Sequence, residues 1–380
     1  MTPDKSPQIL IIAGEASGDI HGAELVSAAK RIKDIHFFGI GGKSMQKAGV
    51  EIVQDIEDMA VMGFIEVLGK LPKILGILKM MKELAKSRKP DLAILIDYPD
   101  FNLRLAKYLH KIGIPIIYFI SPQVWAWRKG RVKLISKIVK KILVIFPFEV
   151  DFYKKNGVDA VYVGHPLCNV VNESIERDPK NRSDYDFNDE GKLFGFLPGS
   201  RKSEISYHMQ TIIDSAKLLK EKYPDAQFGI VKASNLDNAI FDPYININDL
   251  DIKIIDDHHH GFMKLCDFII TSSGTATLET ALVGTPMAVV YRCSFLTYLL
   301  GRLVINVPNI AMANLVAGKE IVPEFIQNQF KPKPLVEKII EILESTEKYE
   351  RMKSELAKIH QKLGDEIAAD HAAKLIVKYL

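Results

Sequence analysis

Several features that would place this 380-residue chain in a specialised class are missing from its sequence. It has three cysteines, Cys168, Cys266 and Cys293, which are widely separated and form no Cys-x-x-Cys pair. This spacing argues against a disulfide framework and favours a reducing compartment. No uninterrupted apolar run is long enough to span a bilayer, and the polar N-terminus does not resemble a secretion signal. We therefore expect a cytoplasmic protein, either free or peripheral on a membrane.

An excess of one charge is also missing. The chain has 50 Lys and Arg against 47 Asp and Glu, so its overall charge does not argue for a nucleic-acid partner. It has no short-period repeat and no low-complexity segment. Hydrophobic residues make up 47% of the sequence, and its length is sufficient for two domains with separate cores.

The apolar segments follow a pattern that is typical of a parallel α/β protein. Continuous apolar runs between helical patterns indicate strands that are covered on both faces of a sheet. The first half has such runs at 9–12, 37–40, 92–96, 114–119, 142–146 and 160–163, and the second half at 193–197, 228–231, 252–255, 268–270 and 287–290. We expect two doubly wound, Rossmann-like domains that face each other across a cleft.

A polar stretch at 168–191 separates the two halves and is the predicted linker. The expected organisation is a first domain at 1–167, a second at 192–333 and C-terminal helices at 334–380. Ligands bind at the carboxyl ends of the strands in open α/β sheets. Two such sheets could hold a donor on one side and an acceptor on the other.

The most informative motif follows the apolar run at 268–270. Ser273, Gly274 and Thr275 form a turn of small residues between a strand and a helix. Such a turn brings backbone N–H groups and the positive end of a helix to one point, which suits a phosphate. Glu279, just past the first helical turn, could reach a polyol held there. An ordinary capped helix without a ligand is the alternative.

A second anion-binding loop is predicted in the same sheet. Gly199, Ser200 and Arg201 follow the strand at 193–197. Glycine lets the backbone approach a phosphate, and Arg201 could pair with it through two N–H groups. Taken alone, a turn with a solvated arginine is an equally good interpretation. Beside the Ser273 turn, both loops could meet one diphosphate.

Acidic residues occur at strand ends in the first half. Asp97 could take a proton from an attacking hydroxyl, while Asp100 could equally be the base or cap the following helix. It is equally consistent with the sequence that Asp97 is a turn residue with no role in catalysis. Glu15, Ser17 and Asp19 follow the first strand, where two acids would repel phosphate. That loop suits a polyol or an acceptor, or is a capped helix start.

The sequence predicts neither a metal nor a cofactor. Asp256, Asp257 and the three histidines at 258–260 resemble a metal cluster, but adjacent side chains point in different directions and spaced ligand pairs are missing. Two Asp-x-Asp pairs, at 184–186 and 249–251, lie in polar connections rather than at strand ends.

Two segments combine apolar or aromatic residues with cations. Residues 64–81 suit either a buried helix pair or a surface in the headgroup region of an anionic membrane. The residues expected in a membrane contact are Ile65, Val67, Leu68, Leu71 and Leu75. The basic segment at 125–133 could meet nucleic acid, but anionic lipid or a substrate phosphate agrees better with the balanced charge.

An ordered set of motifs resembles the lipid-A-disaccharide synthase family. The matching segments are 13–19 (AGEASGD), 60–63 (AVMG), 96–102 (IDYPDFN), 121–128 (SPQVWAWR), 163–166 (VGHP), 197–201 (LPGSR) and 273–279 (SGTATLE). Each motif is weak alone, but together they run along nearly the whole chain in order. The segment from Pro334 onward adds little.

The resemblance implies a B-type glycosyltransferase fold and a metal-independent reaction at the inner face of the cytoplasmic membrane. UDP-2,3-diacylglucosamine and 2,3-diacylglucosamine 1-phosphate would be joined with inversion and release of UDP. The essential aspartate falls on Asp97. The diphosphate and ribose contacts fall on the loops of Arg201, Ser273, Gly274 and Glu279, and Asn314 matches a further cleft motif. Tyr98 stands where a smaller residue is common in the family.

Two other classes remain open at this stage. A related enzyme acting on a soluble sugar nucleotide, such as an epimerase, would not need the lysine-threaded apolar surface. A non-enzymatic membrane or nucleic-acid binder would not need Asp97 and Glu279 in loops of the two sheets. A homodimer is compatible with the sequence.

Overall fold

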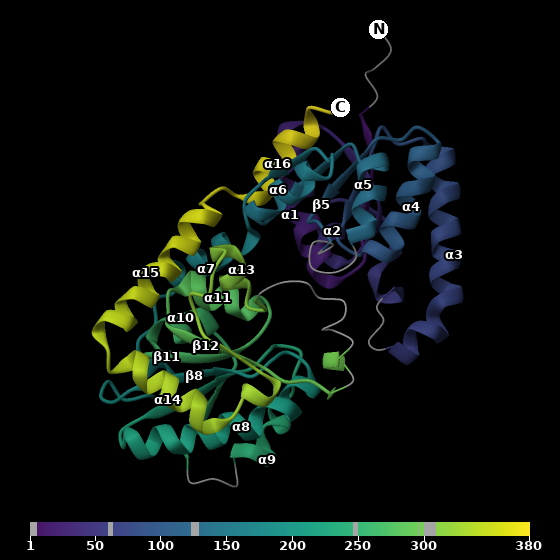
Figure 1. Cartoon of the computed structure of the whole chain (residues 1–380). Helices are drawn as coiled ribbons and strands as arrows, with labels where there is room; N and C mark the ends of the chain where they lie inside the picture. The colour runs from purple at the N-terminus through teal and green to yellow at the C-terminus, as the bar shows by residue number, and fades with distance from the viewer. Residues whose placement is uncertain (1–5, 60–63, 123–128, 246–249, 296, 300–308) are drawn as a thin grey trace. The chain divides into compact units, whose positions relative to one another are not determined.

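The computed structural model describes residues 6–59, 64–122, 129–245, 250–295, 297–299 and 309–380, with the backbone alone for 64–70 and 129. By its internal contacts the chain forms two compact units. Unit 1 comprises Met1–Pro166 and Glu366–Leu380, and unit 2 comprises Leu167–Asp365. Each unit contains a parallel sheet with helices on its faces (Figure 1).

In unit 1, the described strands form one parallel sheet in the order β3-β2-β1-β4-β5-β6-β7. The strands are β1 (Gln8–Ala13), β2 (His36–Gly41), β3 (Glu51–Asp55), β4 (Leu92–Ile96), β5 (Ile116–Phe119), β6 (Lys141–Val144) and β7 (Ala160–Tyr162). The helices are α1 (Ala16–Ile32), α2 (Lys43–Lys47), α3 (Phe64–Arg88), α4 (Pro99–Lys111), α5 (Val132–Ile138), α6 (Pro147–Lys155) and α16 (Ala368–Val377), with the short helices η1 (Ile56–Asp58) and η2 (Lys129–Arg131). Because β1 pairs with β4, the loops that follow these strands are neighbours.

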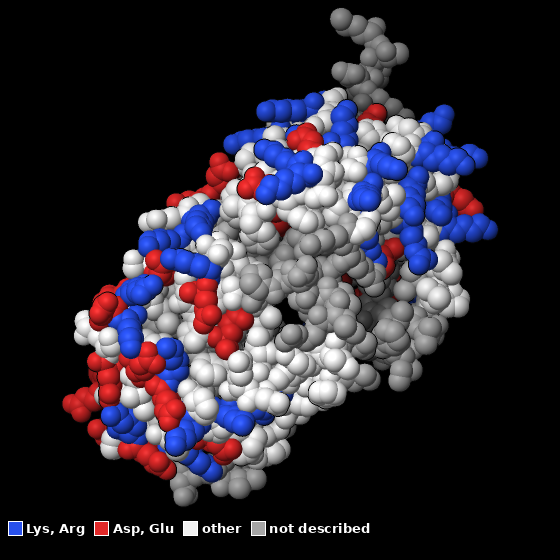
Figure 2. All heavy atoms as spheres, in the orientation of Figure 1, with Lys and Arg blue, Asp and Glu red and all other residues white. Residues whose placement is uncertain are grey.

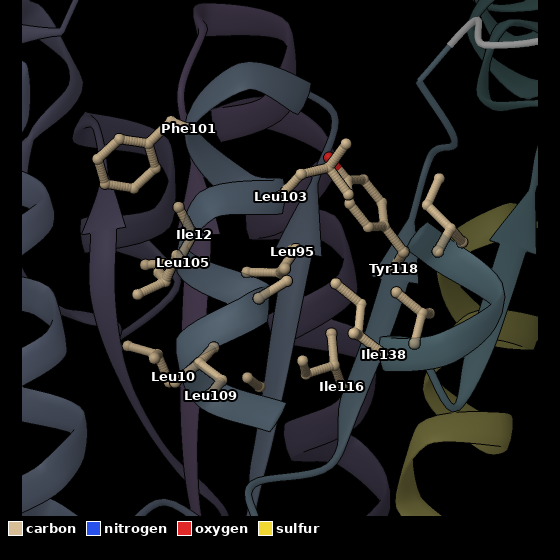
Figure 3. Close-up of a cluster of buried hydrophobic side chains, with 14 of the residues drawn as sticks. Leu10, Ile12, Leu95, Phe101, Leu103, Leu105, Leu109, Ile116, Tyr118 and Ile138 are labelled. Carbon is tan, nitrogen blue, oxygen red and sulfur yellow. The ribbon is translucent and has the colours of Figure 1, made fainter. Parts of the chain in front are cut away.

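The sheet of unit 1 is covered on both faces because its strands are apolar throughout. Leu10 and Ile12 pack with α3, α4 and α5 in one buried cluster, whereas Ile9 and Ile11 pack with α1 and α16 in the other. This alternation is the two-residue period of a strand. Figure 3 shows the first cluster, in which the aliphatic side chains of α4 lie against those of β1, β4 and β5.

In unit 2, the described strands form a parallel sheet in the order β10-β9-β8-β11-β12-β13. The strands are β8 (Leu193–Leu197), β9 (Gln227–Val231), β10 (Ile252–Ile255), β11 (Phe268–Ser272), β12 (Met287–Tyr291) and β13 (Glu324–Ile326). The helices are α7 (Pro166–Arg177), α8 (Lys202–Lys222), α9 (Asp242–Ile245), α10 (His259–Leu265), α11 (Thr275–Val283), α13 (Met312–Ala317), α14 (Pro332–Leu343) and α15 (Thr346–Leu363), with the short helices η3 (Arg182–Tyr185), η4 (Asn238–Ile240) and η5 (Gln327–Gln329). The pairing of β8 with β11 brings together the two loops that were expected to meet a diphosphate.

The division into units differs from the expected boundaries at two places. The stretch expected as a linker contains α7 and η3 and belongs to unit 2, where Cys168 and Val171 are buried. The C-terminal helices do not form one block, because α14 and α15 pack in unit 2 whereas α16 packs against α1 in unit 1. An ion pair of 2.5 Å between Arg31 and Asp370 joins α1 to α16.

None of the helices within the described ranges combines the length and the apolar character that are needed to cross a bilayer.

Candidate functional sites

A pocket of about 330 Å³ lies at the carboxyl ends of the strands of unit 2. It includes the loops after β8, β9 and β11 and the start of α10. Its lining contains seven of the predicted sugar-nucleotide residues, namely Gly199, Ser200, Arg201, Ser273, Gly274, Thr275 and Glu279. The two loops that the sequence singled out separately therefore form one cavity.

The turn before α11 is held open by its own hydrogen bonds. Gly274 is the N-cap, with φ 152° and ψ −159°, and the space where a side chain would stand contains no atom within 4 Å. The Ser273 hydroxyl donates to the Ile310 carbonyl at 2.9 Å, and the Thr277 hydroxyl donates to the Gly274 carbonyl at 2.8 Å. The N–H groups of the first turn precede the helix's own hydrogen-bond pattern, so they are placed to bind an anion.

The loop between β8 and α8 is shaped by Glu204, which the sequence did not single out. One of its carboxylate oxygens accepts from the N–H groups of Ser200 and Arg201 at 2.8 and 3.2 Å, and the other lies 3.1 Å from the Arg201 guanidinium. A capping box normally starts with Ser or Thr, and Arg201 stands at that position instead, which is why the spacing gave no signal. The Arg201 side chain is 75% exposed and therefore accessible to a ligand.

His208 supports this loop from inside the unit. Its Nδ1 lies 2.7 Å from the Pro198 carbonyl, which can only accept, so Nδ1 carries the proton. Its Nε2 then accepts from the Arg292 N–H at 2.9 Å. Burial lowers the pKa of His208, and its backbone partners only partly oppose this shift. The neutral ring therefore joins the loop after β8 to the end of β12.

The three consecutive histidines have three different environments, as expected of adjacent residues. His258 pairs with Asp178 at 3.2 Å, and His259 lines the pocket with its Nε2 buried and without a hydrogen-bond partner in the described part of the chain. The Nε2 of His260 lies 3.5 Å from a carboxylate oxygen of Glu279. No cluster of three or more His, Cys, Asp or Glu side chains among the described residues could hold a metal ion.

Asn314 does not line the pocket, and its amide is used within its own segment. It donates to the Val322 carbonyl at 2.9 Å and to Glu324 at 2.8 Å, and it accepts from the N–H groups of Ile321 and Val322 at 2.8 and 3.0 Å. Glu324 also accepts from the N–H of Ile310, whose carbonyl receives the Ser273 hydroxyl. Asn314 is fully buried, and through Glu324 and Ile310 it stabilises the segment that binds Ser273 of the pocket.

In unit 1, Asp97 and Tyr98 both adopt left-handed backbone conformations, with φ 41° and 43°. Non-glycine residues in this region are strained and persist only where neighbours hold them. Asn102 donates to the Asp97 carbonyl at 2.8 Å, and the Tyr118 hydroxyl donates to the same oxygen. A side chain at Gly14 would come within 2.2 Å of the Tyr98 ring, so only glycine permits this packing.

The Asp97 carboxyl lies in an unfavourable place for a charge. Burial and, to a smaller extent, the charge of Glu15 raise its pKa, a hydrogen bond from the Tyr98 N–H partly opposes them, and the net result is a pKa of about 6 instead of 3.8. Such a pKa suits a group that exchanges protons near neutral pH. Asp100 differs, because it is 73% exposed and forms an ion pair with Arg131.

The first loop of unit 1 divides into exposed and structural residues. Glu15 and Ser17 are exposed at the start of α1. Asp19, expected to bind an acceptor, is buried, and it accepts from the N–H groups of Gly42, Ser44 and Met45 at 2.6, 2.9 and 3.1 Å. Its carboxylate is thus used to hold the start of α2.

The expected membrane segment forms α3, a helix with an apolar face and exposed leucines. Ile77, Leu78, Met81 and Ala85 are buried, whereas Leu71 and Leu75 are 40% and 44% exposed. Figure 2 shows Lys and Arg side chains gathered on the surface of unit 1 near α3 and α4. The side chains of Ile65, Val67 and Leu68, which were also expected in this contact, lie outside the described residues.

The fold of two α/β units, each with a parallel sheet, is shared with solved structures of epimerases and glycosyltransferases. The chain superposes on a UDP-GlcNAc 2-epimerase from Neisseria meningitidis bound to UDP-GlcNAc with a TM-score of 0.64 and 14% identity, over 98% of both chains. The calicheamicin glycosyltransferase gives a TM-score of 0.63 and 14% identity, over 99% of this chain and 98% of that one. At such identities the likeness concerns the fold, which is that of the B-type glycosyltransferases.

Sequence comparison specifies the family. A model of the family described as lipid-A-disaccharide synthetase matches residues 9–377. A lipid-A-disaccharide synthase from Geobacter sulfurreducens is 42% identical over 381 aligned residues, covering 100% of this chain and 99% of that protein. The chain belongs to the lipid-A-disaccharide synthetase family.

Proposed function

We propose that this chain is an inverting glycosyltransferase that joins UDP-2,3-diacylglucosamine to 2,3-diacylglucosamine 1-phosphate and releases UDP. The family supports the reaction. The structural observation that carries the proposal is the pocket of unit 2, in which a helix N-terminus, Arg201 and Glu279 line one cavity. A nucleoside diphosphate needs these groups, because its phosphates are anionic and its ribose presents two hydroxyls.

In this proposal, the N–H groups at the start of α11 and the Arg201 guanidinium bind the diphosphate, and Glu279 accepts hydrogen bonds from the ribose. Charge grows on the diphosphate as the sugar departs. Donors that are already in place stabilise that charge without reorganising. Because the backbone N–H groups of Ser200 and Arg201 are bound by Glu204, and Ser273 is bound to the Ile310 carbonyl, the pocket is formed before a donor arrives.

Unit 1 would supply the base. Asp97 takes the proton from the primary hydroxyl of the acceptor, which attacks the anomeric carbon from the face opposite UDP. The raised pKa of Asp97 and its fixed backbone support this choice over Asp100, which is exposed and paired with Arg131. Glu15, Ser17 and Asp100 remain the proposed acceptor contacts, and Asp19 is omitted because its carboxylate is used by α2.

We place the enzyme at the surface of an anionic membrane, in contact with UDP-sugar and lipid substrates. The exposed Leu71 and Leu75 support this location, since acyl chains need an apolar surface on which to land.

The proposed function is tested directly by incubating the purified protein with UDP-diacylglucosamine and the acceptor in detergent. We expect disaccharide and UDP to appear in equal amounts. Consumption of the donor without disaccharide would point to a different UDP-sugar enzyme, such as an epimerase, and would overturn the proposal.

Substitutions in the donor pocket should weaken UDP binding while the fold is kept. Arg201→Ala and Glu279→Ala should each raise the Kd for UDP by about tenfold, since each removes a charge-assisted hydrogen bond. Arg177→Ala is the matched control, because Arg177 forms an exposed ion pair on α7 of the same unit. A chelator should leave turnover unchanged, and an absolute metal requirement would contradict the mechanism.

A further inference from the structure

The histidine run at the start of α10 has no assigned role, although two of its members lie at the donor pocket. His260 is mostly buried, with 14% of its side chain exposed, and it stands between Glu279 of α11 and Ser174 of α7. Its Nδ1 lies 3.0 Å from the Ser174 hydroxyl, and its Nε2 lies 3.5 Å from Oε2 of Glu279.

Both ring nitrogens of His260 are used by these contacts. The Glu279 carboxylate can only accept, so its approach favours a proton on Nε2, while Nδ1 forms the hydrogen bond with the Ser174 hydroxyl. The ring is thus held between Ser174 and Glu279, in hydrogen-bond contact with the first and in ion-pair contact with the second. Such outer partners commonly fix the orientation of a residue that touches a ligand.

We propose that His260, held by Ser174, is a positioning residue that orients the Glu279 carboxylate toward the ribose hydroxyls of the donor. The inference rests on the proposed donor role of Glu279. An isolated glutamate on a helix has several rotamers, and only some of them point the carboxylate at a bound ribose. The contact with His260 selects among them before binding, which lowers the entropy lost when the ribose is bound.

The test compares two ligands, UDP and 2′,3′-dideoxy-UDP, by calorimetry on the full chain. His260→Ala should weaken UDP binding by about tenfold and leave dideoxy-UDP binding unchanged. Ser174→Ala should have a smaller effect of the same kind. His260→Gln should restore part of the affinity, because its amide N–H can replace Nε2. A damaged pocket would instead weaken both ligands equally, and that result would overturn the proposal.

Two further variants separate this inference from the donor site itself. His258→Asn is the matched control, since His258 lies in the same run with φ 51°, a conformation that Asn tolerates, and it contacts Asp178 rather than Glu279. The double variant His260→Ala/Glu279→Ala should bind UDP no more weakly than Glu279→Ala alone. Additive losses of UDP affinity would contradict a shared role of the two residues. If Glu279→Ala leaves UDP binding unchanged, the proposed donor role of Glu279 is wrong. If Glu279→Ala weakens UDP binding but His260→Ala does not, only the positioning role of His260 is wrong.

Discussion

Asp97 combines two unfavourable features in one residue, a left-handed backbone and a carboxyl group that is partly removed from water. Neither would persist on the surface of a loop without support. Asn102 and Tyr118 stabilise the backbone by binding the Asp97 carbonyl, and both belong to the core around β4 and β5. The same rigidity that strains Asp97 would hold its carboxylate in place for proton transfer.

The first prediction concerns turnover. Asp97→Asn should lower kcat by about two to four orders of magnitude and leave UDP affinity unchanged, because the amide cannot accept the proton. Wild-type turnover should fall as the pH decreases through about 6, where Asp97 becomes protonated. Asp100→Asn is the comparison, because it should weaken acceptor binding without removing the base. Near-normal turnover of Asp97→Asn would transfer the role of base to Asp100 or Glu15.

The second prediction concerns stability and follows from the same pKa. The folded pKa of about 6 exceeds the ordinary 3.8, so the stability gained by protonating Asp97 is complete below about pH 3.8 and lost as the pH rises through 6. Asp97→Asn should therefore raise the free energy of unfolding at pH 7.5 by up to about 3 kcal/mol. Denaturant unfolding at pH 7.5 and pH 4 checks this, and an equal effect at both pH values would contradict it.

Polar residues also show where inference from sequence reaches its limit. The pocket-lining residues could be found because small residues, glycine and arginine follow apolar strands. Asp19 and Asn314 look equally suited to a ligand, yet their hydrogen bonds go to other groups of their own unit. Residue type reveals hydrogen-bonding capacity, but only the fold shows which partner uses it.

At the level of elements, the apolar runs predicted the central strands because those strands are buried on both faces. The two strands that were not predicted, β3 and β13, contain no fully buried residue. Helix starts were predicted less accurately. The apolar pattern predicts helices that begin at Gly22 and at about Ile205, but α1 begins at Ala16 and α8 at Lys202, because the residues of their first turns are small or polar. Helix α7 is amphipathic, but it lies in a stretch of mostly polar residues and was therefore expected to be part of a linker.

The third prediction concerns α3. Replacing Leu71 and Leu75 together with Ser should weaken binding to anionic vesicles by about tenfold or more, because each exposed leucine would contribute about 1 kcal/mol on insertion. Turnover on a short-chain soluble substrate should largely survive. Leu78→Ser is the contrasting variant, since Leu78 is buried in the core and its loss should destabilise the fold. Unchanged vesicle binding would contradict a membrane contact at Leu71 and Leu75, and the segment 125–133 would then be the next candidate.

The whole molecule consists of two units, and unit 1 is built from two segments that are separated in the sequence by unit 2. Unit 1 is completed by α16, which follows all of unit 2 in the sequence. Amphipathic periodicity predicts a helix at this position but cannot show which unit it covers. The contact is substantial, because Ala369, Ala372, Ala373 and Ile376 of α16 join the buried cluster beside β1 and β4.

The fourth prediction tests this arrangement. Ala373→Glu would place a charge at a fully buried position of α16 and should destabilise unit 1 by about 3 kcal/mol or more. Hydrogen exchange of the backbone amides of β1 and β4, which lie in the sheet of unit 1, checks this. UDP binding should be retained, since the pocket lies within unit 2. Lys374→Glu, at an exposed neighbouring position, is the control, and loss of UDP binding in Ala373→Glu alone would show that the units do not fold separately.

The position of α16 also has a consequence for the time course of synthesis. The strands of unit 1 are complete once Tyr162 has been made, but the apolar face that α16 covers stays open while Leu167–Asp365 are translated. At ordinary rates of synthesis this interval lasts roughly 10–40 s. During it, the nascent chain carries a sheet face that α1 covers without α16, on a ribosome that is producing the other unit. Unit 2 can therefore finish folding before unit 1, and the N-terminal half is the part most exposed to aggregation before the chain is released.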